Sequence, residues 1–325
     1  MKIIDAFRHG LSLVTKHQRI VAVIYLVNLC IGLVFAAPLF IFFHGKVGRL
    51  AIREELVAGF SYSWWSTFDF SAEGLEKTIR PALTGGFGPL FDNLELLLTG
   101  QFQTFGWFVF AIAVVYLFVA AFLNGGAIGL FADERKSFST GRFFSNAGAF
   151  FHHMAALAAT AILVFALLYK VINPLVFSLV DSIVGETTSQ PLAWFVNLAG
   201  YLVILMLVFF LTLVLDYAKI IVINEKKESS WLCIWLSLKF MVRNFSRIVG
   251  LNLLLLLIAL AVMVIGGALM SLVQPTQFFL LILAILIQQV YILAKIAVRL
   301  TFYAAESALY QQQTAAATVV KKRKR

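Results

Sequence analysis

The sequence predicts an all-α integral membrane protein with six transmembrane helices, and three observations support this fold class. First, 61% of the 325 residues are hydrophobic and only 13% are charged, whereas soluble domains are about 45–50% apolar and about 25% charged. Second, six apolar stretches reach the length of about 20 residues that a helix needs to cross a bilayer. Third, Lys and Arg gather on one side of these stretches, as they do in multi-pass proteins.

The predicted spans follow directly from the apolar stretches. They cover Ile20–Phe43, Gln103–Leu123, Met154–Val180, Ala193–Val222, Ile248–Val273 and Phe278–Thr301. The first run is itself long enough to span, and no small-residue cleavage site follows it. We therefore do not expect a cleavable signal peptide.

The distribution of basic residues predicts the orientation. With the N-terminus in the cytoplasm, twenty of the 26 Lys and Arg residues fall in cytoplasmic segments. The outer loops hold only five, namely Lys46, Arg49, Arg53, Lys77 and Arg80. Since Lys and Arg accumulate on the cytoplasmic side, both termini are expected there. The net charge of +10 is thus read as a topology signal, and no nucleic-acid partner is expected.

The cytoplasmic entries of the odd-numbered spans share an amphipathic, aromatic-rich character. These entries are Phe7–Arg19, Phe143–His153 and Phe240–Arg247. Amphipathic segments with aromatic and basic residues favour helices that lie in the membrane interface. We therefore expect three hairpins, each preceded by a cytoplasmic interfacial helix.

The exits of the even-numbered spans also resemble one another. Residues 127–139 read AIGLFADERKSFS and residues 218–230 read AKIIVINEKKESS, while AKIAV at 294–298 echoes the start of the second copy. One interpretation is a threefold repeat of interfacial helix and hairpin. The alternative is that every multi-pass protein carries basic, amphipathic cytoplasmic flanks, and the sequence leaves both open.

The chain divides into one membrane domain and a tail. Residues 1–310 form the six-helix domain, and its outer loop, 44–102, is expected to contain short interfacial helices. Residues 311–325 are expected to be a disordered basic cytoplasmic tail. Its five terminal cations could tether the tail to anionic lipid headgroups or could serve only as a solvated topology signal; they are Lys321, Lys322, Arg323, Lys324 and Arg325.

Two long segments carry a resemblance to a known group of proteins. Residues 125–157 read GGAIGLFADERKSFSTGRFFSNAGAFFHHMAAL, and residues 216–254 read DYAKIIVINEKKESSWLCIWLSLKFMVRNFSRIVGLNLL. Both resemble a widespread group of uncharacterised bacterial six-span proteins, similar in layout to the membrane domain attached to some glycerophosphodiester phosphodiesterases. The resemblance implies the six-span architecture and a bacterial cytoplasmic membrane, and it implies no activity.

A few polar residues fall inside the predicted spans, where they are costly and therefore candidates for function. We select Asn28, Lys170, Asp216 and Gln288 as candidates to line a polar cavity. The alternative is that the amides hold helices together and that Asp216 forms a local i,i+3 pair with Lys219.

The sequence offers little evidence of catalytic chemistry. It has no Gly-x-Ser-x-Gly, no His-Glu-x-x-His and no phosphate-binding loop, and no His lies deep in a predicted span. We therefore expect a non-catalytic protein without metal or cofactor. The leading hypothesis is an accessory or scaffold protein in the bilayer that binds other membrane proteins or lipid. The alternative is a transporter or lipid-handling protein.

Overall fold

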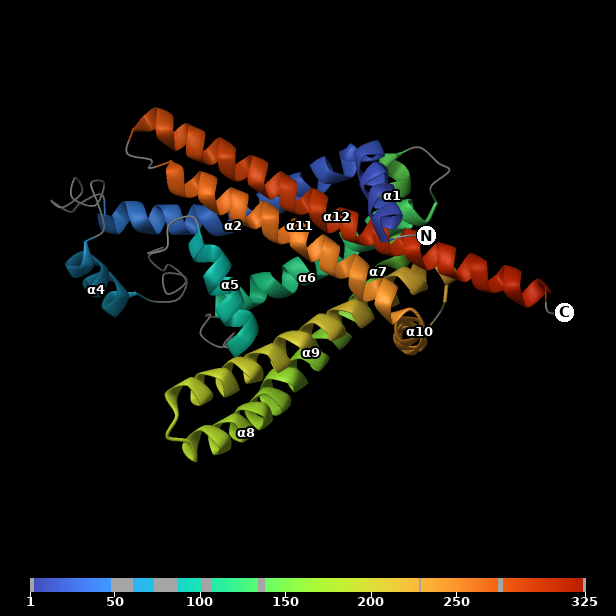
Figure 1. Cartoon of the computed structure of the whole chain (residues 1–325). Helices are drawn as coiled ribbons and strands as arrows, with labels where there is room; N and C mark the ends of the chain where they lie inside the picture. The colour runs from blue at the N-terminus through green and yellow to red at the C-terminus, as the bar shows by residue number, and fades with distance from the viewer. Residues whose placement is uncertain are drawn as a thin grey trace.

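The computed structural model describes residues 3–47, 61–72, 87–100, 107–133, 138–227, 229–273 and 277–323, and these residues form helices and short connections without strands. Figure 1 shows their arrangement. The helices are α1 (Ile3–Lys16), α2 (Gln18–Val47), α4 (Tyr62–Ser71), α5 (Gly88–Thr99), α6 (Trp107–Ala132), α7 (Thr140–Leu167), η4 (Leu168–Ile172), α8 (Asn173–Gly185), α9 (Gln190–Glu225), α10 (Ser230–Arg243), α11 (Phe245–Leu272) and α12 (Phe278–Arg323).

Six helical segments are long and apolar enough to cross a membrane, as the sequence predicts. They are Gln18–Ile41, Ala111–Ala132, Thr140–Gly185, Gln190–Glu225, Phe245–Leu272 and Phe278–Ala315. The second segment ends later than the predicted end at Leu123. The run from Gly125 to Ala132 is uncharged and apolar. Glycine at position 126 lets α6 approach α7 closely, since a Cβ there would stand 2.8 Å from the Phe143 ring.

Of the three expected amphipathic entry helices, Phe7–Arg19 falls largely in the separate helix α1, whereas Phe240–Arg247 spans the end of α10, the turn at Asn244 and the start of α11. The chain bends at His17 between α1 and α2, and at Asn244 between α10 and α11. The third expectation is wrong, because Phe143–His153 belongs to the continuous helix α7. Its residues Phe143 and Ala147 are fully buried, so tight packing against α6 holds this stretch in line with its span.

The C-terminal residues from Gln311 were expected to be disordered, and this expectation is wrong for the backbone of 311–323, which continues α12. Gln311 donates to Asn224 Oδ1 at 2.9 Å, and Arg247 donates to Gln313 Oε1 at 2.7 Å. These contacts fix the first turn, and the alanines that follow favour a helix. The cationic side chains of 321–325, and the backbone of Lys324 and Arg325, lie outside the described residues.

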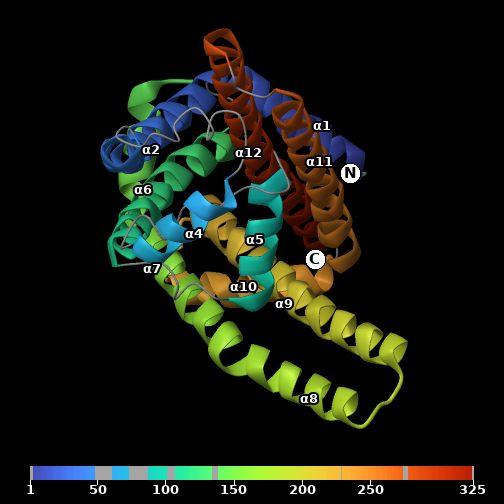
Figure 2. The same cartoon turned by 90° about the vertical axis from the view of Figure 1, so that its left-hand side faces the viewer.

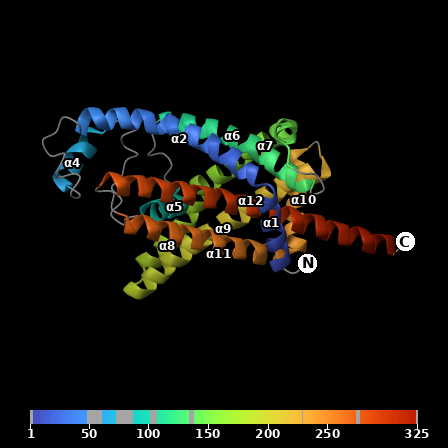
Figure 3. The same cartoon turned by 90° about the horizontal axis from the view of Figure 1, so that it is seen from above.

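The buried core lies at the end of the molecule that carries both chain ends. In Figures 1 and 3, the N and C marks lie at one end together with α1 and α10, while α4 and α5 lie toward the other. The main core there includes Phe131, Phe143, Tyr217, Ile248 and Leu251, all completely buried. The opposite halves of the long helices are exposed, such as Leu272 at 80% and Phe278 at 78%, as expected for side chains that face lipid.

The hairpin of α8 and α9 diverges from the other spans toward the far end, as Figure 2 shows from that side. The third span does not stop at Pro174. Instead the π-turn η4 precedes Pro174 and carries the helix onward into α8, because a wider turn tolerates the missing N–H of proline. In the segment between α2 and α6, α5 packs against this turn, where Tyr169 donates to the Leu97 carbonyl at 2.5 Å.

Candidate functional site

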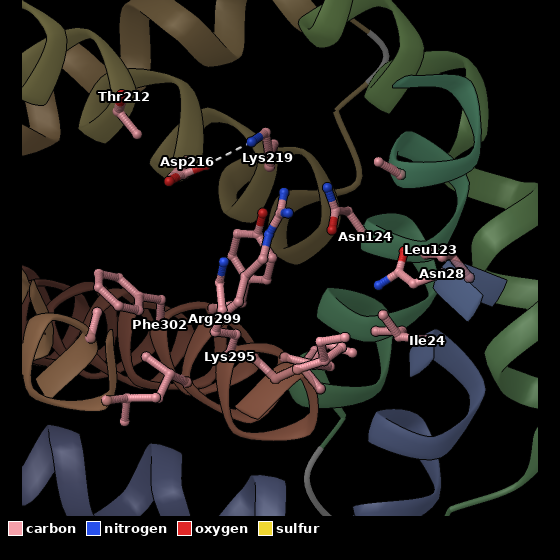
Figure 4. A pocket seen from close by; sticks show the side chains of 18 of the residues that line it. Ile24, Asn28, Leu123, Asn124, Thr212, Asp216, Lys219, Lys295, Arg299 and Phe302 are labelled. Atoms are coloured by element: carbon pink, nitrogen blue, oxygen red, sulfur yellow. Dashed lines mark hydrogen bonds and ion pairs between the residues drawn. The ribbon is translucent and has the colours of Figure 1, made fainter. Parts of the chain in front are cut away.

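A cavity of about 660 Å³ lies between α2, α6, α9, α11 and α12. Its lining combines charged, polar and apolar side chains from all five helices. Figure 4 shows them at close range. The lining residues are Ile24, Asn28, Tyr116, Ala120, Leu123, Asn124, Thr212, Asp216, Lys219, Ala259, Val262, Met263, Ile292, Lys295, Ile296, Val298, Arg299, Leu300, Phe302 and Tyr303.

Helical spacing explains why the polar residues converge on one space. On α12, Lys295, Arg299 and Tyr303 follow one another at intervals of four residues. On α9, Thr212 and Asp216 are also four residues apart. Residues three or four apart share a helix face, so α9 and α12 each present a polar stripe to the cavity.

Charge on the α9 wall is paired. Lys219 Nζ lies 2.6 Å from Asp216 Oδ1, and the two side chains are only 20% and 18% exposed. The same ammonium group lies 5.8 Å from the centroid of the Tyr303 ring, a distance at which a cation is attracted by the ring face. One ion pair and one aromatic contact from α12 therefore hold Lys219 at the cavity.

Charge on the α12 wall is positive and lacks an acidic partner among the described residues. Lys295 and Arg299 are both exposed, and the described part of the chain places no carboxylate in ion-pair contact with either. Lys295 lies 5.3 Å from the centroid of the Tyr291 ring. In Figure 4, the Arg299 side chain extends from α12 toward Lys219 and Asn124. Arg299 also interacts with the Tyr303 hydroxyl and lies in the field of Asp216, but no carboxylate at ion-pair distance neutralises either cation in the described part of the chain.

The remaining wall is divided between amides and apolar side chains. Asn28 of α2 and Asn124 of α6 face the cavity from the side opposite α9 and α12 in Figure 4. The α11 wall is apolar and consists of Ala259, Val262 and Met263. The cavity therefore offers a cationic, hydrogen-bonding part and an apolar part, which together suit an amphiphilic molecule.

The structure brings together two of the four candidates from the sequence. Asn28 and Asp216 line the cavity, and Gln288 and Lys170 do not. Gln288 is exposed, whereas its neighbour Gln289 accepts a hydrogen bond from Tyr25 at 2.8 Å, since adjacent helix positions diverge by about 100°. Lys170 is exposed on η4 and is not part of the lining.

Sequence reasoning missed the two open cations. Lys295 and Arg299 lie inside the predicted span Phe278–Thr301, but they were counted only among the cytoplasmic Lys and Arg and not among the polar residues of the spans. In the structure α12 continues beyond Thr301 to Arg323 and buries Thr301 and Tyr303. The available signal was the four-residue spacing from Lys295 to Tyr303, which places both cations on one helix face.

A second group of polar side chains is buried near the cavity without lining it. Glu306 is 0% exposed, and neither of its carboxyl oxygens has a hydrogen-bond partner in the described part of the chain. The same holds for the Tyr217 hydroxyl and the Ser307 hydroxyl. Burial of an unpaired carboxylate costs far more than burial of the neutral acid. We therefore count only the lining residues in the net charge of the cavity.

Histidines contribute little to the site. Among residues that the structure describes, no three His, Cys, Asp or Glu side chains are placed to hold a metal ion. His153 shares a hydrogen bond with the Ser230 hydroxyl, with Nδ1 and Oγ 3.1 Å apart. At the bend before α2, burial and the charges of Lys16 and Arg142 lower the pKa of His17, which favours a neutral ring.

Comparison of the chain with protein families, with characterised proteins and with solved structures gave no match.

Proposed function

We propose that this multi-pass membrane protein handles lipid: it takes up an amphiphile from the bilayer into the cavity between α2, α6, α9, α11 and α12. The amphipathic character of the lining supports this most strongly. Open cations on α12 suit a polar headgroup, and the apolar α11 wall suits a hydrocarbon chain. In a lipid environment an exposed cation needs a polar or anionic partner, and a bound headgroup supplies one.

We place both termini on the cytoplasmic side of a bacterial inner membrane. Support comes from the excess of Lys and Arg in the segments at the end of the molecule that holds α1 and α10. In this orientation the cations of α12 lie toward the cytoplasmic leaflet. The amphiphile would then enter from that leaflet.

The lipid-handling function is tested by filling the cavity. Ala259→Trp places a bulky ring on the α11 wall, and Ala261→Trp makes the same change at an exposed position of the same helix outside the lining. Native mass spectrometry of protein purified in mild detergent should show a bound amphiphile in the wild type and in Ala261→Trp. Ala259→Trp should lose it. Equal retention by both variants would contradict the proposal.

The scaffold function is the second candidate, and one surface favours it. On α10 an exposed apolar stripe is formed by Trp231, Trp235, Leu238 and Val242, which share a face at helical spacing. A protein partner or the bilayer interface could cover this stripe. A scaffold predicts stoichiometric recovery of a partner protein after gentle purification, and its loss in Trp231→Ser/Trp235→Ser with the bound amphiphile unchanged.

A further inference from the structure

The charged residues of the cavity indicate the chemical class of its ligand. The lining holds three cations, Lys219, Lys295 and Arg299, and one acid, Asp216. Asp216 is bonded to Lys219 at 2.6 Å. The cavity therefore presents two positive charges in excess, and the exposed pair on α12 carries them.

The geometry of these two cations suits a compact anion. Lys295 and Arg299 are four residues apart on one helix, which brings their side chains to neighbouring positions on the same face. A guanidinium group can bind two oxygens of one phosphate at once, and an ammonium group contributes a mobile point charge. Asn28 and Asn124 add hydrogen-bond donors on the opposite wall.

We propose that the cavity recognises a phosphomonoester, with Lys295 and Arg299 binding its oxygens and Lys219 standing beside them. The inference rests on the proposed function and names the headgroup of the amphiphile. A phosphomonoester carries about −1.5 to −2 charges at pH 7, which matches the excess of two. A phosphodiester headgroup carries one negative charge and leaves one cation without a partner, and a zwitterionic headgroup has no net charge.

The same chemistry occurs in a lipid and in a soluble phosphomonoester, so the experiment uses both. Purified full-length protein is titrated with phosphatidic acid, phosphatidylglycerol and phosphatidylcholine of identical acyl chains, each at the same mole fraction in nanodiscs. Inorganic phosphate and glycerol 3-phosphate are titrated separately. We expect phosphatidic acid to bind roughly tenfold or more tightly than phosphatidylglycerol, because a second charge-assisted contact is satisfied.

Variants assign the contacts. Lys295→Gln and Arg299→Gln should each weaken phosphatidic acid binding by roughly tenfold and reduce its preference over phosphatidylglycerol. Arg299→Lys keeps the charge and removes the two-pronged geometry, so its affinity should fall between those of wild type and Arg299→Gln. Lys170→Gln removes an exposed cation of another span outside the cavity and should bind as the wild type does. Elution as a single monodisperse species shows that each variant is folded.

The outcomes separate this inference from the function on which it rests. Equal affinity for phosphatidic acid and phosphatidylglycerol, or no effect of Arg299→Gln and Arg299→Lys, would overturn the phosphomonoester assignment. If Ala259→Trp still abolishes lipid binding in that case, the lipid-handling function stands. If inorganic phosphate or glycerol 3-phosphate binds as tightly as phosphatidic acid and competes with it, phosphomonoester recognition is supported and an amphiphilic ligand is overturned.

Discussion

The polar residues within the spans show how far sequence reasoning reaches at the scale of single residues. Asn28 and Asp216 were predicted from their position in apolar stretches, and both line the cavity. Gln288 was predicted in the same way and is exposed. Residue type and depth in a span predict that a polar group needs a partner. They do not predict which face of the helix it occupies relative to four other helices.

The two lysines of the AKIIV and AKIAV segments, Lys219 and Lys295, show the value of the repeated pattern. Both lie on the cavity wall, one on α9 and one on α12. Their environments differ, since Lys219 is paired with Asp216 while Lys295 is open. Similar sequence therefore brings two cations to one site, and a single acidic residue decides which of them is free.

Replacement of Asp216 by Asn should have opposite effects on stability and on ligand affinity. Loss of the carboxylate leaves Lys219 without its 2.6 Å partner, and leaving such a partly buried group unpaired costs about 1–3 kcal/mol. The melting temperature of the ligand-free protein should fall, and Asp216→Asn/Lys219→Met should recover part of the loss. Because Lys219 is also released for a ligand, affinity for the anionic headgroup should rise.

The control for this prediction is Asp181→Asn, which removes an exposed carboxylate of α8 outside the cavity. It should leave both the melting temperature and the affinity within error of the wild type. An unchanged melting temperature in Asp216→Asn would mean that the pair contributes nothing to stability.

At the scale of elements, the spans were predictable and their interruptions were not. The length of the apolar stretches alone predicts the six spans. In the bilayer core, backbone N–H and C=O groups must form hydrogen bonds within the segment, and this favours a helix irrespective of the neighbouring helices. Packing determines why the chain bends at Asn244 but continues without a bend through Phe143–His153 of α7. Phe143 and Ala147 are completely buried against neighbouring helices, and a hydrophobic pattern does not show whether such a face turns toward protein or toward the bilayer interface.

The crossing of α1 over α12 depends on one glycine. A Cβ at Gly10 would lie 2.6 Å from the backbone nitrogen of Ala305, closer than atoms can approach without movement of one helix. Ala305 is completely buried and precedes Glu306. The close approach of α1 thus covers the part of α12 that carries the unpartnered carboxyl group.

Gly10→Val should separate α1 from α12 and lower the stability of the folded protein by about 1–3 kcal/mol. The measurement is the thermal melting temperature in detergent together with the rate of limited proteolysis at α1. Gly148→Val makes the same substitution within helix α7 at a position where no atom lies within 4 Å of a Cβ. It should leave stability unchanged or slightly higher, because Val has a better helix propensity than Gly. Similar losses in both variants would show that the crossing is not tightly packed.

At the scale of the whole molecule, the sequence predicted the number of spans and the structure supplied their arrangement. The spans meet in a buried core at the end that holds both termini, and the α8–α9 hairpin diverges from the others at the far end. The sequence does not predict this divergence, because lipid-facing and protein-facing positions are equally apolar in the halves of the helices that lie far from the buried core. The cavity lies among five helices that are distant in sequence, and so it could not be placed before the packing was known.

The orientation of this arrangement makes a final prediction. The positive-inside rule predicts that the end with α1, α10 and the chain termini lies in the cytoplasm and that the turn between α8 and α9 lies on the opposite side. In a background with Cys30→Ser and Cys233→Ala, a single cysteine at Thr188 of that turn should react with a membrane-impermeant maleimide added to intact cells. A cysteine at the exposed Gln312 of α12 should react only after the membrane is permeabilised.

The reverse labelling pattern would mean that the protein has the opposite orientation in the membrane. The amphiphile would then enter from the opposite leaflet. Labelling of both sites in intact cells would mean that the two ends of α9 do not lie on opposite sides of a single bilayer.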